Sequence, residues 1–158
     1  MTIHRLLLLT LLFCALAAAA PHGSSDATDS VAGGGTPSPW ADLGFPLPGA
    51  AGTPHLRGVG STLPLAPYAL EVTSAAANAD GYLFIGFGVG NTPFLGGFMV
   101  PEFIALAPIV TDESGKLSLP GRWPPELVQV IVYLQVWLID PTGSHGATAT
   151  NGLAATAL

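Results

Sequence analysis

Ser144 and His145 are the residue types in this chain best suited to covalent chemistry, since a serine hydroxyl beside an imidazole forms the nucleophile and base of many hydrolases. Their adjacency argues against that role, because neighbouring side chains on an extended chain point to opposite sides. The sequence also lacks the Gly-x-Ser-x-Gly turn that exposes a hydrolase nucleophile. His22 and His55 stand in no catalytic or zinc-binding pattern. We therefore expect a loop histidine at position 145, no catalytic residues and no enzymatic activity.

Asp112, Glu113 and Ser114 are the best candidates for a metal site, because their oxygens in a loop could bind calcium. Calcium needs six or more oxygen ligands, so a plain turn explains the segment better. The other carboxylates include Glu71 and Glu102. Two carboxylates act together in glycoside hydrolysis only at a suitable distance, and the sequence does not give the distances between these side chains. We expect no metal and no cofactor.

The glycine pattern from Gly86 to Gly90 resembles part of a phosphate-binding loop, but it lies inside a predicted strand with no helix after it. Glycines in a strand indicate that a neighbouring backbone or ring approaches closely.

Three tryptophans could stack on sugar rings, which makes glycan binding the alternative function. Trp137 lies in the longest apolar run, so we expect it in the core. Trp123 precedes Pro124 and is expected to close one end of the core. Trp40 is the one that we expect to be exposed.

The elements that must position these residues are short strands separated by Gly, Pro, Asn and Asp. Apolar and polar residues alternate from Tyr68 to Ser74 and from Lys116 to Leu119, as in half-buried strands. The sequence predicts further strands over 82–89, 94–99, 103–110 and 147–158, and a hairpin-type loop over 111–115. Pro101 and Pro108 are expected at strand edges, strand ends or bulges. The uncharged run from Val128 to Ile139 predicts a central strand.

These strands predict an all-β fold, a single antiparallel β-sandwich with jelly-roll or immunoglobulin-like topology over residues 40–158. The segment before it, residues 20–39, is rich in Ser, Gly, Thr and Pro and predicts a flexible linker.

Residues 1–19 predict a secretory signal peptide. Arg5 precedes an apolar core from Leu6 to Leu12, and small residues end the segment at Ala17 to Ala20, which suits cleavage after Ala19. The apolar core is too short for a transmembrane span. Cys14 lacks the small preceding residue of a lipidation site. We expect a secreted protein, periplasmic or extracellular, with no transmembrane span in its mature form.

Composition narrows the function further. Cys14 is the only cysteine, so no disulfide can stabilise the mature chain. Charged residues make up 9% of the sequence, against about 25% in an average soluble domain. Only Arg57, Lys116 and Arg122 remain as basic residues beyond the predicted signal peptide. Nucleic acid, which needs clustered Lys and Arg, is therefore not an expected partner.

Short motifs occur in a characteristic order: Asp42-Leu-Gly, Gly52-Thr-Pro, Thr92-Pro-Phe-Leu-Gly-Gly97 with Val100-Pro, Thr111-Asp-x-x-Gly115, Trp123-Pro, Gln135-x-Trp-x-x-Asp140 and Thr150-Asn-Gly-Leu. This order resembles a family of secreted bacterial β-sandwich domains, over about Trp40 to Leu158. Such domains occur at the ends of large exported proteins and as separate secreted chains. They have no assigned activity, so the resemblance implies a fold and a location but no active site.

Together these observations predict a non-enzymatic structural or interaction module of the cell envelope or extracellular matrix. Its partners would be other envelope proteins or copies of itself, because a surface with few charges gives little repulsion between copies. A carbohydrate-binding module is the alternative, with glycans as partners.

Overall fold

The computed structural model describes residues 38–158, so the predicted signal peptide and nearly all of the predicted linker lie outside the described residues. Within this range the elements are β1 (Trp40–Gly44), β2 (His55–Gly60), β3 (Pro67–Thr73), β4 (Asp80–Phe94), β5 (Gly97–Val110), β6 (Leu117–Arg122), β7 (Ile131–Ile139), the 3-10 turn η1 (Ser144–Gly146), β8 (Ala147–Ala149) and β9 (Gly152–Thr156).

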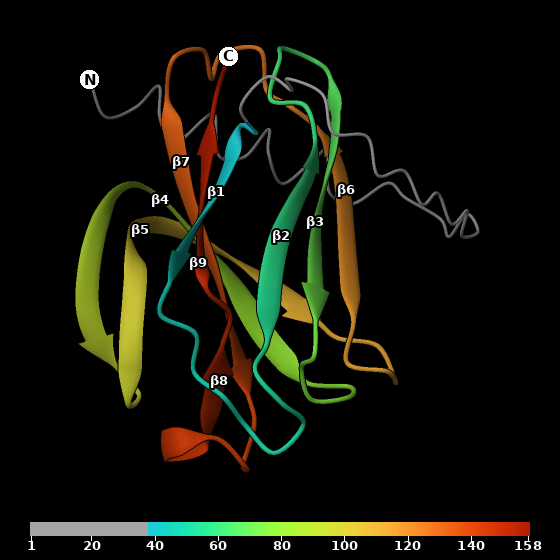
Figure 1. The fold of residues 1–158 in the computed structure, drawn as a ribbon, viewed down its shortest axis with the longest axis vertical. Coiled ribbons are helices and arrows are strands. Elements are labelled where there is room, and N and C mark those ends of the chain that lie inside the picture. The colour runs from blue at the N-terminus through green and yellow to red at the C-terminus, as the bar shows by residue number, and fades with distance from the viewer. Residues whose placement is uncertain (1–37) are drawn as a thin grey trace, which may run out of the picture.

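Two antiparallel sheets pack against each other (Figure 1). The larger sheet has the strand order β1-β9-β7-β4-β5, with β8 paired to β7. The smaller sheet has the order β2-β3-β6. The predicted all-β sandwich is therefore confirmed.

Alternation of side chains builds the core between the sheets. Leu70 and Val72 of β3 are buried there with the even-numbered residues Val132 to Leu138 of β7 in the other sheet, and Leu83 of β4 lies beside β7 in the same core. Leu117 and Leu119 of β6 pack against the same cluster, as their spacing predicts. β7 lies between β9 and β4, so the prediction of a central strand is confirmed, although the strand begins only at Ile131.

The predicted strand over 94–99 is wrong. β4 runs on to Phe94, Leu95 and Gly96 form the turn with φ values of 43° and 84°, and β5 continues without a break to Val110. The prolines were misleading as signs of strand boundaries, because Pro101 and Pro108 lie inside one strand. That strand is at the edge of the sheet, where the missing proline N–H groups are tolerated, as expected.

Three other segments differ from the predicted elements. β1 lies in a stretch where the sequence analysis predicts no strand. Its stability comes from pairing with β9, more than a hundred residues away. The loop over 111–115 joins β5 to β6 and so crosses between the sheets, which makes it a connection rather than a hairpin. The segment 147–158 forms two strands, not one.

The far end of the β4–β5 hairpin bends back over the larger sheet. Register shifts between Ile85 and Thr92 interrupt the ladder there. Gly86 allows the bend, because a Cβ at this position would collide with the carbonyl of Glu102. The prediction of a close backbone approach at the strand glycines is therefore confirmed.

Gln135 of β7 holds the bent hairpin in place. Its Oε1 accepts a hydrogen bond from the Val100 N–H at 2.9 Å, and its Nε2 donates to the carbonyls of Phe98 at 3.2 Å and Thr150 at 3.0 Å. The ring of Phe94 lies against that of Trp137, with centroids 4.9 Å apart. A second buried cluster forms on this outer side of the sheet, from Leu47, Phe84, Met99, Trp137, Ala147 and Ala149.

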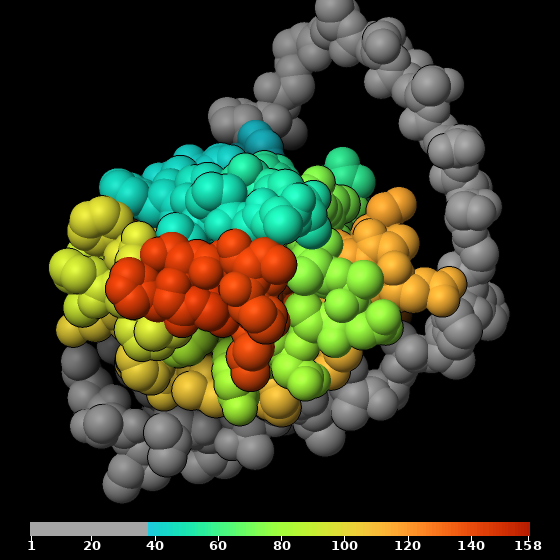
Figure 2. Space-filling view, turned by 90° about the horizontal axis from the view of Figure 1, so that it is seen from below, coloured from blue at the N-terminus to red at the C-terminus, as the bar shows by residue number. Residues whose placement is uncertain are grey.

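One end of the molecule brings three distant segments together. Figure 2 shows the loop before β2, the segment around η1 and the hairpin turn side by side. Between β8 and β9, the side chain of Asn151 accepts from the Leu56 N–H and donates to the Leu56 carbonyl, at 2.8 and 3.1 Å. This one amide joins the two sheets at that end.

Candidate functional site

Ser144 and His145 lie close together, contrary to the expectation that they point apart. Ser144 Oγ and His145 Nδ1 are 2.8 Å from each other. The reason is the backbone, since His145 has a φ of 54° within the 3-10 turn and the chain is not extended there. Both residues are exposed, and in residues 38–158 no carboxylate is bonded to the His145 ring. The pair packs beside Gly96 of the hairpin turn.

Asp112 organises its own loop. Its Oδ1 accepts hydrogen bonds of 2.8 Å from the backbone N–H groups of Ser114 and Lys116 and from the Ser114 hydroxyl. The bond from the Lys116 N–H, followed by that from the Ser114 hydroxyl, lowers the pKa of Asp112 below its ordinary value. Among the described residues, no three His, Cys, Asp or Glu side chains gather where they could hold a metal ion. The calcium hypothesis for Asp112 and Glu113 gains no support from this geometry.

The three tryptophans do not form a sugar-stacking platform. Trp123 and Trp137 are buried, as predicted. The expectation for Trp40 is wrong, because it is half-buried: its ring lies 6.1 Å from Tyr68 and 6.0 Å from Trp123. The Trp40 indole N–H donates to the carbonyl of Gly60 at 3.0 Å, which ties β1 to the smaller sheet.

The remaining candidates from the sequence stay separate. His55 Nε2 lies 3.4 Å from a carboxylate oxygen of Asp42, on the surface. Glu71 pairs with Arg57, which donates from Nε at 2.7 Å. His22 lies outside the described residues.

The outer face of the larger sheet carries the feature that stands out, an exposed apolar band. We use the name outer-face band for Tyr82, Phe103, Leu106, Val110 and Ile139, which are 43%, 48%, 42%, 54% and 60% exposed. They lie on the neighbouring strands β7, β4 and β5, where Tyr82 pairs with Pro108 and Asp80 with Val110. On the other side of the same strands Leu83, Ala107, Ile109 and Leu138 belong to the core, so the sheet is apolar on both sides.

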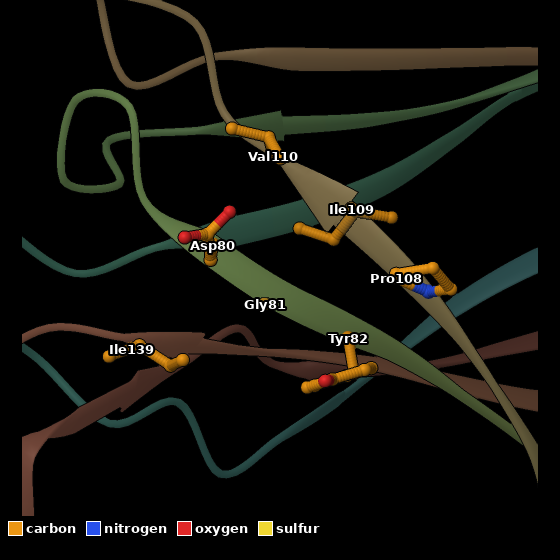
Figure 3. A pocket seen from close by; sticks show the side chains of 7 residues that line it. All are labelled: Asp80, Gly81, Tyr82, Pro108, Ile109, Val110 and Ile139. Carbon is orange, nitrogen blue, oxygen red and sulfur yellow. The ribbon is translucent and has the colours of Figure 1, made fainter.

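Two hollows flank this band. The first has a volume of about 390 Å³ and is lined by Asp80, Gly81, Tyr82, Pro108, Ile109, Val110 and Ile139. Figure 3 shows Asp80 and Tyr82 on β4, with Ile139 on the β7 side and Val110 on β5. The second, of about 320 Å³, lies under the bent hairpin and is lined by Phe84, Thr92, Phe94, Met99, Pro101, Glu102 and Phe103.

The few charges are divided between the two sheets. The carboxylates of Asp80 and Glu102 are the charged groups lining the two hollows. Arg57, Lys116 and Arg122 all belong to β2, β6 or the residue before β6, in the smaller sheet. A partner for the outer face therefore meets apolar side chains and, in the two hollows, two carboxylates.

Sequence reasoning missed this band as a site, although a signal was present. The face of β4 with Tyr82 and Phe84, and the face of β7 with Trp137 and Ile139, are both apolar on the side away from the core. A sheet that is apolar on both sides needs a cover, and only part of this one is covered by the bent hairpin.

In residues 38–158 no helix is long and apolar enough to cross a membrane. The sequence matches no protein-family model, no curated protein and no solved structure. The resemblance to secreted bacterial sandwich domains thus stays a prediction that rests on the order of the motifs.

Proposed function

We propose that this chain is an exported, non-enzymatic interaction module of the cell envelope or extracellular matrix, and that it binds through the outer face of its larger sheet. The observation that carries the proposal is the outer-face band, five large apolar side chains exposed side by side on three strands. Single exposed apolar residues are ordinary, but a contiguous patch of this kind is typical of an interaction site. The predicted signal peptide supports export.

The energetics favour reversible binding. The band exposes roughly 500 Å² of apolar surface, whose burial contributes about 12 kcal/mol at ~25 cal/mol per Å². Association costs about 4–15 kcal/mol in lost freedom of motion. The free energy gained by burying the band and the cost of association nearly balance, so the bound fraction should depend strongly on concentration.

The test replaces two residues of the band, with a matched control on the other sheet. In the Tyr82→Asp/Val110→Asp variant two carboxylates enter the band, whereas Val59→Asp introduces one on the exposed side of β2. We expect the double variant of the exported chain to elute much earlier from a phenyl column and to lose concentration-dependent growth in light scattering. The control should behave like the wild type. Equal retention and scattering of all three proteins would refute the proposal.

A glycan is the second candidate ligand, and one observation favours it. Tyr82 presents an exposed ring in the 390 Å³ hollow, and Asp80, two residues earlier on the same side of β4, supplies a carboxylate. An aromatic face beside a hydrogen-bond acceptor suits a sugar ring. Tyr82→Ala should then abolish binding on a glycan array, while Trp40→Phe should leave it unchanged.

A further inference from the structure

The hollow under the bent hairpin combines aromatic rings with a carboxylate. Its volume of about 320 Å³ is at the lower end of the range of small-ligand sites. The rings of Phe84, Phe94 and Phe103 line it together with the thioether of Met99. Glu102 is the one charged residue among the lining side chains. A ligand in this hollow therefore meets π-systems and a negative charge.

The three rings stand at steep angles to one another. The ring of Phe103 on β5 is at 90° to that of Phe84 on β4, with centroids 5.3 Å apart. The ring of Phe94 is inclined by 63° to that of Phe84, at 6.4 Å, and its contact with Trp137 holds it in place. A cation is attracted to an aromatic face within about 6 Å of the ring centroid. Rings this close allow one cation in the hollow to interact with more than one of them.

The glycine pattern of β4 explains how the carboxylate reaches the hollow. A Cβ at Gly88 would lie only 2.8 Å from Glu102 Oε2, so the glutamate side chain lies in space that a larger residue would fill. Neither of the two ion pairs in the described part of the chain includes Glu102. A bound cation would supply the counter-charge that this carboxylate lacks there.

We propose that the hollow under the bent hairpin binds a quaternary ammonium group between its phenylalanine rings and the Glu102 carboxylate. The side chains that line it offer few hydrogen-bond acceptors, chiefly Glu102 and the Thr92 hydroxyl. A lysine ammonium or an arginine guanidinium would leave several N–H donors unsatisfied against such a lining, whereas a fully alkylated ammonium has none. This site goes beyond the binding proposed for the outer-face band, although Phe103 belongs to both.

Calorimetric titration of the exported chain with choline tests the role of the charge. The matched control ligand is the neutral isostere of choline, in which a carbon atom replaces the quaternary nitrogen. We expect choline to bind at least tenfold more tightly than this isostere, because only choline interacts with the carboxylate and with the ring quadrupoles. Equal binding of the two compounds, or no binding of choline, would overturn the proposal.

Two exposed residues of the site provide variants that should fold normally. Glu102→Gln removes the charge at nearly constant shape, and should weaken choline binding at least tenfold without changing the binding of the isostere. Phe103→Leu removes one ring and should weaken choline binding about fivefold. Glu126→Gln removes an exposed carboxylate between β6 and β7 and is the matched control. An unchanged affinity in Glu102→Gln, or an equal loss in Glu126→Gln, would also overturn the site.

Vesicles distinguish the two sources of a quaternary ammonium group. Flotation of the chain with phosphatidylcholine vesicles but not with phosphatidylglycerol vesicles, lost in Glu102→Gln, would support the site with a lipid headgroup as its ligand. Binding of choline without flotation would support it with a dissolved compound.

The outer-face band can be tested separately, because Tyr82 and Val110 line the other hollow. Tyr82→Asp/Val110→Asp should bind choline like the wild type. If choline does not bind to the wild type while the double variant still loses retention on the phenyl column, the ammonium site fails and the proposed function survives.

Discussion

Replacing Gln135 should release the bent hairpin from the larger sheet. Gln135 is 0% exposed, and its amide bonds to the Val100 N–H, the carbonyls of Phe98 and Thr150, and the indole N–H of Trp137. Leucine at this position removes that partner from all four groups, of which three are buried and the Phe98 carbonyl is part-buried. Each unsatisfied group costs about 1 kcal/mol or more, so we expect Gln135→Leu to lose roughly 4 kcal/mol of stability. Native domains have a free energy of unfolding of about 5–15 kcal/mol, so this loss would be a large fraction of the total stability.

The chain offers a matched pair for this test, since Gln129 is its other glutamine and is exposed. Gln135→Glu replaces the donor Nε2 by an oxygen that faces the Phe98 and Thr150 carbonyls, so it should cost roughly 3 kcal/mol or more at neutral pH. Gln129 has a left-handed backbone conformation, which Gln129→Glu does not change. The free energy of unfolding of this variant should therefore stay within about 0.5 kcal/mol of the wild-type value.

Urea unfolding followed by tryptophan fluorescence measures these differences, and hydrogen exchange locates them. The Val100 amide should be protected in the wild type and exchange much faster in both Gln135 variants. Burial would raise the pKa of this acid in the folded state, so the ionisation penalty of Gln135→Glu should shrink as the pH falls towards the unfolded pKa of about 4 and be absent below it, whereas the penalty of Gln135→Leu should not change. A loss below 1 kcal/mol in both variants, or an equally protected Val100 amide, would refute the assignment of Gln135 as the residue that holds the hairpin.

Three further predictions follow from the remaining contacts. The pKa of Asp112 is lowered in the folded state, chiefly by the Lys116 N–H, so its contribution to stability is present above the unfolded pKa of about 4 and lost as the pH falls through the folded value. Asp112→Asn should thus weaken the pH dependence of urea unfolding below about pH 4, and an unchanged acid limb would contradict this. Gly58→Ala should displace Trp40, whose ring occupies the space of a Cβ there, with a red-shifted emission and a loss of about 1–3 kcal/mol. Intact mass of the exported protein should show a chain beginning at Ala20; an uncleaved chain would contradict the predicted signal peptide.

Local sequence patterns predicted those strands whose conformation is decided by residues close to them in the chain. The alternation in β3 and β6 is visible because one face of each meets the core between the sheets, whereas β7 is visible as a long uncharged run. β1 could not be found in this way, since its five residues are stabilised by β9. The hairpin turn at Leu95 and Gly96 was missed because prolines inside β5 suggested two strands where an edge tolerates one.

Several of the short motifs that occur in order along the sequence have structural roles. Gln135 and Trp137 anchor the hairpin, Asn151 joins the sheets, and Asp112 closes a loop. The outer-face band could not be predicted from any one motif, because it is formed by three strands whose order in the sheet the sequence does not reveal. Likewise, the contact between Ser144 and His145 depends on a single left-handed backbone angle.

The pairing of β1 with β9 has a consequence for when the fold can form. β9 lies between β1 and β7 in the larger sheet, so β1 cannot join that sheet before Leu153 to Thr156 are available. Contacts this far apart in sequence close late and slowly. A chain that emerges from the ribosome or from a membrane channel with its N-terminus first therefore stays open until its final strand is free. Such delayed closure would suit a protein that must cross a membrane as an unfolded thread and acquire its shape on the far side.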